Sequence, residues 1–321
     1  MKTRILTALA ALSMVAMTAP ASAQDYPNRP VKWVVGYPAG GTTDILARIV
    51  GQRLSEKLGQ QFVIENKPGA GNNIATESVV TSPPDGYTLL LVNPANGINA
   101  SLYSKLNFNF IRDIAPVVGL IRVPNVMEVH PSVPAKTVEE FIAYAKANPG
   151  KINMASSGLG TSIHLSGELF MAMTGVKMTH VPYRGSAPAL TDMLAGNVHV
   201  IFDNMPSSIQ HIKAGSLRAL AVTTEQRAKA LPDVPTVGDT VKGYEASAWF
   251  GIGVPKGTPR AIIDKLNAEV NAILAEPAIR TKLEDMGGIF MNGTPEEFGK
   301  IVESETEKWA KVVQSSGAKV D

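Results

Sequence analysis

The residues best suited to chemistry form a glycine-rich turn near the N-terminus. Val31–Tyr37 is apolar and predicts a strand, Gly40 and Gly41 follow it, and Thr43–Leu58 has the apolar spacing of a helix. Glycines leave backbone N–H groups uncovered, and the first turn of a helix carries a partial positive charge. This turn is therefore predicted to bind an anion.

A second turn of the same kind lies in the middle of the chain. Residues 156–161 read Ser-Ser-Gly-Leu-Gly-Thr and stand between a strand-like run, Lys151–Ala155, and a helical run, Ile163–Thr174. The hydroxyls of Thr161 and Ser162 could cap that helix or contact a ligand, because both roles place them at the same point. Two such turns in one chain suggest two lobes that close over one small acid.

Several side chains near the predicted site allow two interpretations. Asp44 cannot attract an anion, so we favour an ordering role for it over contact with the ammonium group of an amino-acid ligand. His164 is more simply explained by packing than by binding. Arg184 could hold a carboxylate through two hydrogen bonds or form a surface ion pair. Trp249 and Phe250 suit core packing, with a cleft wall as the alternative.

The N-terminal residues predict a secretory signal. Lys2 and Arg4 precede an apolar segment, Ile5–Thr18, and small residues lead to a cleavage site after Ala23. The chain is therefore expected to be exported from the cytoplasm. A lipid-anchored form is excluded, because the chain has no cysteine at the cleavage site or elsewhere.

Composition excludes several partners. Removal of Lys2 and Arg4 with the leader leaves 28 of the 30 basic residues against 28 acidic ones, so the mature chain has no electrostatic footprint for nucleic acid or an anionic membrane. The absence of cysteine excludes disulfides and thiolate zinc sites. No apolar run after the leader reaches the roughly 18–20 residues that a membrane span needs, so a soluble globular protein is expected.

Strand-like and helical runs alternate in two blocks, which predicts an α/β fold with mainly parallel sheets. The first block continues after the opening turn with Phe62–Glu65, Asn73–Thr81 and Tyr87–Val92. The second block comprises Thr137–Ala147, Lys151–Ala155, Ile163–Thr174, Lys177–Pro182, Ser186–Leu194, Val198–Phe202, Pro206–Ala214 and Ala219–Thr223. Loops at the carboxyl ends of such strands are the usual ligand sites.

The C-terminal part is expected to return to the first block. Ala246–Val254 predicts a strand, Pro259–Ala275 and Pro295–Gln314 predict long amphipathic helices, and no further strand is expected. Lobe 1 would then comprise residues 24–123 and 248–321, and lobe 2 residues 124–247. Two crossings, near 122–126 and 247–250, would form a hinge.

Seven motifs in order carry a resemblance to a known family. They are Gly36-Tyr-Pro-Ala-Gly-Gly-Thr-Thr-Asp44, Glu65-Asn-Lys-Pro-Gly-Ala-Gly71, Pro83-Pro-Asp-Gly-Tyr87, Ser156-Ser-Gly-Leu-Gly-Thr-Ser-Ile-His164, Val181-Pro-Tyr-Arg-Gly-Ser-Ala-Pro-Ala-Leu190, Ile201-Phe-Asp-Asn204 and Pro232-Asp-Val-Pro-Thr236. Together they resemble the extracytoplasmic solute receptors of tripartite tricarboxylate transporters, the Bug family, over essentially the whole mature chain.

The resemblance implies a periplasmic binding protein with a two-lobed type II (Venus flytrap) fold and no cofactor or metal. It would be a monomer that captures a dicarboxylate, tricarboxylate, aromatic acid or acidic amino acid and delivers it to membrane permease subunits. Family members hold the carboxylate through backbone amides, hydroxyls and bridging waters. One departure is Asn93-Pro-Ala-Asn-Gly97, where family members often carry serine, threonine or histidine.

Carried over residue by residue, the resemblance implies ligand-binding residues in both lobes. Lobe 1 would contribute Tyr37, Gly40, Gly41, Thr42, Asp44, Asn93 and Asn96. Lobe 2 would contribute Ser156, Ser157, Thr161, His164, Tyr183, Arg184, Asp203 and Asn204.

Two other functions stay open at this stage. An exported carboxylate-processing enzyme is disfavoured, because the chain has no Gly-x-Ser-x-Gly elbow, His-Glu-x-x-His helix, phosphate loop or cysteine nucleophile, and its five histidines lack metal-ligand spacing. A ligand-responsive partner of a membrane sensor kinase would share the same fold. Neighbouring genes for two permease subunits or for a sensor kinase would separate transport from sensing.

Overall fold

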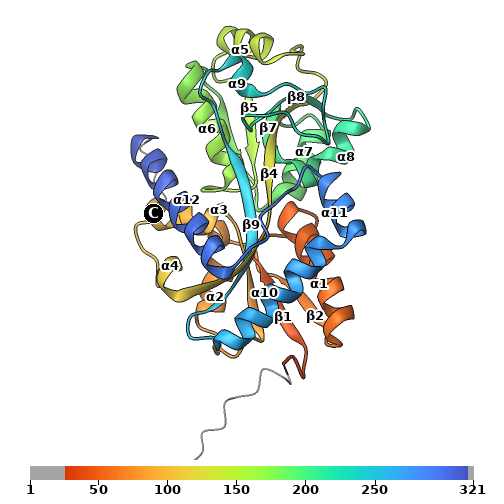
Figure 1. Ribbon diagram of the computed structural model, residues 1–321. Coiled ribbons are helices and arrows are strands. Elements are labelled where there is room, and N and C mark those ends of the chain that lie inside the picture. The colour runs from red at the N-terminus through yellow and green to blue at the C-terminus, as the bar shows by residue number, and fades with distance from the viewer. Residues whose placement is uncertain (1–25, 317–321) are drawn as a thin grey trace, which may run out of the picture.

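Ten strands form one mixed sheet that runs through the molecule (Figure 1). The computed structural model describes residues 26–316, so the predicted signal and its cleavage site lie outside the described residues. The strand order is β2-β1-β3-β9-β4-β7-β5-β6, with β8 and β10 also paired to β4. The α/β class predicted from the alternating runs is confirmed.

Two long strands connect the ends of the sheet. β4 (Ile114–Val129) pairs with β9 (Ser247–Pro255) through Pro124, and then with β7 (Val200–Asn204) from Asn125 onward. All antiparallel pairs among the described strands involve β4 or β9, whereas the outer strands pair in parallel, as predicted.

β4 is a strand that was not predicted from the sequence. Its residues are almost all buried, so the strand lacks the alternation that marks a strand with one wet face. Pro116 and Gly119 also argue against a strand in a sequence pattern. In the structure, shifts in the pairing with β9 begin at these two residues, so the chain accommodates them as irregularities.

The elements fall into two groups on either side of the centre of the sheet. The group here called the lower group contains the first strand, β1, and the last strand, β10. Its N-terminal members are β1 (Val31–Val35), α1 (Thr42–Leu58), β2 (Phe62–Asn66), the 3₁₀ turn η2 (Ala70–Asn72), α2 (Asn73–Val80), β3 (Thr88–Val92), α3 (Pro94–Leu102) and α4 (Phe110–Asp113). Its C-terminal members are α10 (Arg260–Ala275), α11 (Pro277–Glu284), β10 (Ile289–Phe290) and α12 (Pro295–Ser316).

The remaining elements form the upper group (Figure 1). They are α5 (Val138–Ala147), β5 (Asn153–Ser156), α6 (Ser162–Thr174), β6 (Thr179–Pro182), α7 (Ser186–Leu194), β7, α8 (Met205–Lys213), β8 (Arg218–Val222) and α9 (Val237–Thr240).

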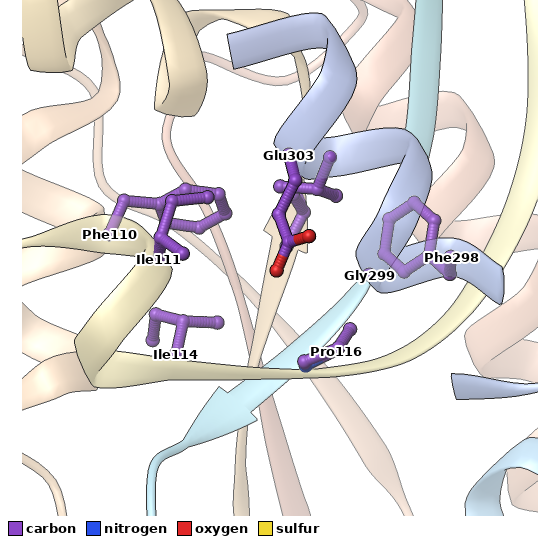
Figure 2. A pocket seen from close by; sticks show the side chains of 9 residues that line it. Phe110, Ile111, Ile114, Pro116, Phe298, Gly299 and Glu303 are labelled. Carbon is purple, nitrogen blue, oxygen red and sulfur yellow. The ribbon is translucent and has the colours of Figure 1, made fainter. Parts of the chain in front are cut away.

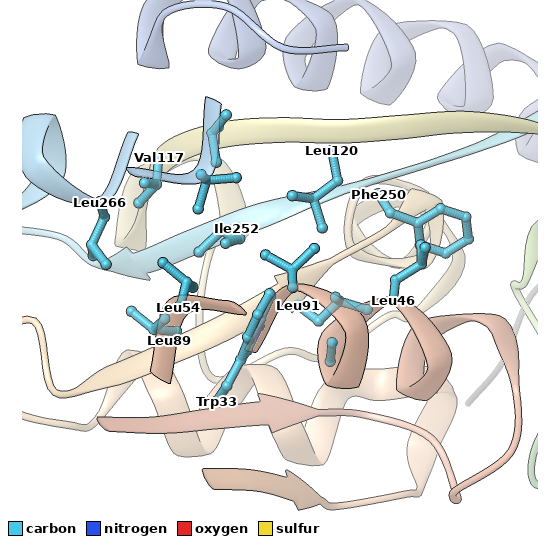
Figure 3. Close-up of a cluster of buried hydrophobic side chains, with 14 of the residues drawn as sticks. Trp33, Leu46, Leu54, Leu89, Leu91, Val117, Leu120, Phe250, Ile252 and Leu266 are labelled. Atoms are coloured by element: carbon cyan, nitrogen blue, oxygen red, sulfur yellow. The ribbon is translucent and has the colours of Figure 1, made fainter. Parts of the chain in front are cut away.

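Each group has its own apolar core. In the lower group, Trp33, Leu46 and Leu89 pack with Phe250 and with Leu266 of α10 (Figure 3). Helix α10, which follows β9 in the chain, therefore packs against the N-terminal elements. In the upper group, a separate cluster contains Phe141, Phe170, Phe202 and Tyr244.

Two features of the C-terminal segment differ from expectation. β10 is a strand where none was predicted, because two residues are too few to show a period; its Ile289 pairs with Arg122 of β4. α12 also reaches the upper group, since Trp309 is buried with Leu102 of α3 and Leu165 of α6. Within residues 26–316, no helix has the length and apolarity to span a bilayer.

Candidate functional site

A small polar pocket lies between the lower and upper groups. The lower group lines it with Tyr37, Gly41, Thr42, Thr43, Asn93, Pro94 and Phe250, and the upper group with Ser157, Thr161, Ser162, Ser186 and Asn204. Its free volume is about 30 Å³, so the two groups stand close together here. At one edge Thr42 Oγ1 lies 3.2 Å from Ser207 Oγ of α8, a hydrogen bond that joins the groups.

Five helices begin at this pocket. Their N-cap residues are Gly41 for α1, Asn93 for α3, Thr161 for α6, Gly185 for α7 and Asn204 for α8. Each helix start offers backbone donors that the helix itself cannot satisfy and a partial positive charge that stabilises an anion by about 0.3–1 kcal/mol. No lysine or arginine occurs among the described residues that line the pocket. The site is therefore suited to an anion held by amides and hydroxyls.

Asp44 orders the first turn. Its carboxylate accepts hydrogen bonds from the Gly40 backbone N–H (3.0 Å), from Arg48 Nε (2.9 Å) and from Asn66 Nδ2 (3.1 Å). Burial opposes the charge of Asp44, but these donors outweigh burial and hold its pKa below the ordinary value. The carboxylate is thus occupied within the lower group, which agrees with the favoured ordering role.

Asn93 supplies a free donor at the pocket. Its Oδ1 accepts the N–H of Ala95 (3.1 Å), and its own N–H donates to Asn96 Oδ1 (2.9 Å), so the pair caps α3. Asn93 is 4% exposed, and its Nδ2 has no hydrogen-bond partner within the described part of the chain. An unpaired buried donor is costly, and a ligand acceptor would remove that cost. Asn96 instead donates to Thr76 and stays outside the lining.

The second turn is held by hydrogen bonds of its own side chains and by His180 of β6. Thr161 Oγ1 donates to the carbonyl of Gly158 (2.8 Å) and accepts the N–H of His164 (3.2 Å). Ser156 is fully buried, and its Oγ lies 2.6 Å from His180 Nε2. These contacts fix the turn, so that Ser157 and Thr161 face the pocket while Ser156 does not.

Two histidines that are distant in sequence stack behind this turn. The rings of His164 and His180 lie 4.1 Å apart and 17° from parallel. His164 Nδ1 accepts the N–H of Gly160 (3.3 Å), and its Nε2 lies 3.4 Å from Glu168. Burial, followed by the neighbouring His164, lowers the pKa of His180 to about 4. His164 thus packs behind the turn and does not line the pocket.

Asp203 lies behind the pocket and does not line it. Its carboxylate accepts hydrogen bonds from Ser186 (2.6 Å), Ser207 (2.5 Å) and Ser208 (2.8 Å). Ser186 lines the pocket, and Ser207 makes the contact to Thr42. Asp203 thus positions the first turns of α7 and α8.

Tyr183 and Arg184 also lie outside the lining. The Tyr183 hydroxyl donates to Asp192 (2.5 Å) within the upper group, and Arg184 is exposed to solvent. The pocket therefore gathers some residues that the sequence had singled out, namely Tyr37, Gly41, Thr42, Asn93, Ser157, Thr161 and Asn204. The predicted residues outside its lining are Gly40, Asp44, Asn96, Ser156, His164, Tyr183, Arg184 and Asp203.

Sequence reasoning did not place several lining residues in the site. These are Thr43, Pro94 and Ser186, together with Ser162, for which capping and ligand contact were both open, and Phe250, for which core packing was the simpler interpretation. Ser186, Pro94 and Thr43 each fall within the first two positions of a helix. The signal that could have found them is the start of every helix that follows a strand end in this fold.

Glycines allow the two groups to meet closely around the pocket. A Cβ at Gly160 would lie 2.5 Å from Leu102 Cδ2, and one at Gly185 would lie 2.8 Å from Pro38 Cδ. Both glycines belong to the upper group, and both contacted residues belong to the lower group. The close approach therefore depends on the missing side chains.

Two other recesses fit an anion less well. One lies between α4 and α12 (Figure 2); its walls are apolar, and Glu303 is the charged residue that lines it. The other is larger, about 720 Å³, and lies between α11 and residues 224–229. Its lining carries four cations together with three acids, Glu225, Glu245 and Glu284. Arg122 pairs with Glu305 (3.1 Å), Arg280 with Glu284 (3.2 Å), and Arg227 donates to the carbonyl of Pro232 (3.3 Å).

Comparison with known proteins agrees with this geometry. Protein BugT of Bordetella pertussis is 36% identical over 314 residues, which cover 96% of this chain and 96% of that protein. The solved structure described as R. palustris Rpa4515 with adipate is 41% identical, with a TM-score of 0.90, and covers 92% of this chain and 100% of its own. MatC from Rhodopseudomonas palustris with bound malate is 31% identical, with a TM-score of 0.85, over 90% of this chain and 100% of its own.

The family comparison gives the same assignment. The solved structure of the periplasmic binding protein BugD is 34% identical, with a TM-score of 0.88, over 92% of this chain and 99% of its own. These relatives are solute-binding proteins rather than enzymes. The sequence-family model described as the tripartite tricarboxylate transporter family receptor matches residues 46–318 of this chain. This chain therefore belongs to the family of tripartite tricarboxylate transporter receptors, the Bug-type solute-binding proteins.

Proposed function

We propose that this protein captures a small carboxylate in the pocket between its two groups and delivers it to the permease subunits of a tripartite tricarboxylate transporter. The observation that carries the proposal is the convergence of five helix N-termini, without a basic side chain in the described lining, beside the unpaired Asn93 Nδ2. The relatives solved with adipate and with malate support a carboxylate ligand.

The lower and upper groups would act as the two lobes of a flytrap. The chain crosses between them within β4 and at the start of β9, near residues 122–126 and 247–250, and these crossings would be the hinge. Two of the helix starts belong to the lower group and three to the upper group. Each lobe alone therefore offers an incomplete set of donors, and tight binding requires closure.

The hydrogen bonds of the first turn narrow the ligand class. An acidic amino acid would need a carboxylate for its ammonium group, and Asp44 was the candidate. Asp44 is already engaged by Arg48, Gly40 and Asn66. The geometry therefore favours a di- or tricarboxylate or an aromatic acid that has no amino group.

A thermal-shift screen tests the proposed function. The mature protein, freed of co-purified ligand by unfolding and refolding, would be titrated with adipate, malate, citrate, benzoate and glutamate. At 100 times the dissociation constant, binding stabilises the fold by about 2.7 kcal/mol, which raises the melting temperature by several degrees. A screen in which no carboxylate raises the melting temperature would contradict the proposal.

Gly41→Leu is the matched variant for this screen. Gly41 has φ −86°, which any residue adopts, and an added Cβ would lie 3.7 Å from Ser186 Cβ, an ordinary contact. The larger side chain should therefore fill the pocket without straining the backbone. We expect a folded protein that no carboxylate stabilises, whereas a retained shift would place the ligand elsewhere.

The protein would act in the periplasm after cleavage behind Ala23. Mass spectrometry of the exported protein should show a chain that begins at Gln24. Recovery of the uncleaved chain from the periplasmic fraction would contradict this processing.

A further inference from the structure

Two buried acids share one hydroxyl beneath the pocket. Glu128 of β4 and Asp203 of β7 both have 0% exposure. Asp203 pairs with Val126 and Glu128 pairs with Ile201, so the two acids lie on the same face of the sheet in diagonal positions. Ser208 of α8 lies between them, with its Oγ 2.6 Å from Glu128 Oε1 and 2.8 Å from Asp203 Oδ2.

Counting hydrogens shows that this arrangement needs an additional proton. Both distances are normal for an O–H···O hydrogen bond. A serine hydroxyl carries one hydrogen and can donate to one of the two acids only. The other acid must therefore donate to Ser208 Oγ, which only a protonated carboxyl group can do.

The surroundings decide which acid holds the proton. Burial raises the pKa of Asp203 as well, but its hydroxyl hydrogen bonds from Ser186, Ser207 and Ser208 stabilise the charged form and oppose that rise. Glu128 has Ser208 alone as a partner, and its Oε2 has none among the described residues although it is buried. An ionised Glu128 would thus be a buried charge without compensation.

We propose that Glu128 is a neutral carboxylic acid in the folded protein, where it donates to Ser208 and thereby positions Asp203 as the single negative charge beneath the pocket. The hydrogen-bond chain then runs from Glu128 to Ser208 to Asp203, which in turn accepts from Ser186 at the pocket wall and from Ser207 at the contact to Thr42. Glu128 is a positioning residue, since it does not line the pocket.

The charged groups around Glu128 agree with this assignment. Burial, followed by the negative charge of Asp203, raises the pKa of Glu128 well above its ordinary value, and the Ser208 hydrogen bond opposes this only in part. Neither acid forms an ion pair with a lysine, arginine or histidine within residues 26–316, and their partners from α7 and α8 are serines. A second negative charge here would repel a carboxylate ligand; this consequence rests on the proposed function, whereas the protonation state does not.

Infrared spectroscopy of the ligand-free protein tests the assignment directly. Exposed carboxyl groups are ionised at neutral pH, so the carbonyl stretch of a protonated carboxylic acid reports a buried neutral acid. We expect this band in the wild type, its loss in Glu128→Gln and its persistence in Asp203→Asn. Absence of the band from the wild type, or its loss in Asp203→Asn with persistence in Glu128→Gln, would overturn the proposal.

The pH dependence of unfolding provides a second readout. Glu128→Gln keeps the shape and a donor for Ser208 but cannot ionise. In the unfolded wild type Glu128 loses its proton above about pH 4.3, whereas the folded protein retains it, so the wild type loses stability relative to the variant as the pH rises. We expect the ratio of their unfolding constants to change by up to about tenfold per pH unit between pH 5 and 7. A ratio that does not change with pH would overturn the proposal.

Discussion

Closure of the two groups over the pocket can be tested at Gly160, in the second turn. Gly160 has φ +74°, and a Cβ there would lie 2.5 Å from Leu102 Cδ2 and 2.7 Å from Asn99 Oδ1, both on α3 of the opposite group. Carbon atoms in ordinary contact are about 3.5–4.0 Å apart. With alanine at this position, either the turn must retreat from α3 or the ends of the Leu102 and Asn99 side chains must move, by roughly 1 Å.

The expected loss of affinity follows from this contact. Overpacking of a well-packed interface costs about 1–3 kcal/mol. Since the clash exists only when the groups meet, this cost opposes closure and appears as a roughly 5- to 150-fold weaker carboxylate affinity. The strain of alanine at positive φ, about 1–2 kcal/mol, applies to open and closed forms alike and lowers stability rather than affinity.

Gly175→Ala separates these two effects. Gly175 ends the helix that Gly160 precedes, has φ +71°, and would place a Cβ with no atom within 4 Å. Calorimetric titration with the best carboxylate of the screen should show weaker binding for Gly160→Ala and wild-type affinity for Gly175→Ala. The urea midpoint of unfolding should be lowered by a similar amount in both variants. Equal affinity in all three proteins would refute the claim that this contact forms on closure.

Three further predictions follow from single residues. Asn93→Asp keeps the cap of α3 but replaces the unpaired Nδ2 donor by a negative oxygen. Calorimetry should show carboxylate binding weakened by at least about tenfold, since a hydrogen bond to a charged group contributes about 1.5–3 kcal/mol. Unchanged affinity would mean that Asn93 is not part of the site. In the folded protein the pKa of His180 is about 4, against an ordinary 6.5, so the unfolded chain takes up the proton first and the free energy of unfolding should fall as the pH drops from 6.5 toward 4. His180→Gln, which keeps a partner for Ser156, should flatten this pH dependence of the urea midpoint. A pH dependence as steep as that of the wild type would contradict the low pKa of His180. Asp44→Asn should lower the urea midpoint and weaken binding together, because the main effect of Asp44 is to order the turn through the hydrogen bond from Gly40, whereas its ion pair with the half-exposed Arg48 contributes little. Weaker binding with an unchanged midpoint would instead indicate that Asp44 contacts the ligand directly.

The elements with clear periodicity were predictable from the sequence. The helix Ser186–Leu194 has the same bounds in prediction and structure, and α1 and α10 differ from prediction by one residue at the start. β4 was not predictable, because burial on both faces removes its alternation and Pro116 mimics a loop signal. Tertiary contacts, rather than local preference, make this segment a strand.

The site was predictable in its backbone and less so in its side chains. The glycine turn at Gly41 and the turn at Thr161 both line the pocket. The position of each turn follows from the order of strand, turn and helix, which the sequence shows. Whether a polar side chain faces the pocket or its own turn depends on its partners in space. Asp203 and Tyr183 point to serines and to Asp192 respectively, and no sequence pattern shows those partners.

Carboxylate capture between the five helix starts is the central claim, and a crystal structure of the protein with the most stabilising carboxylate of the screen tests it most directly. We expect that one carboxylate group lies between the turn at Gly41 and the turn at Thr161 and accepts a hydrogen bond from Asn93 Nδ2. A ligand bound in the larger cavity beside Arg122 and Arg280, or held mainly by an arginine side chain, would contradict it.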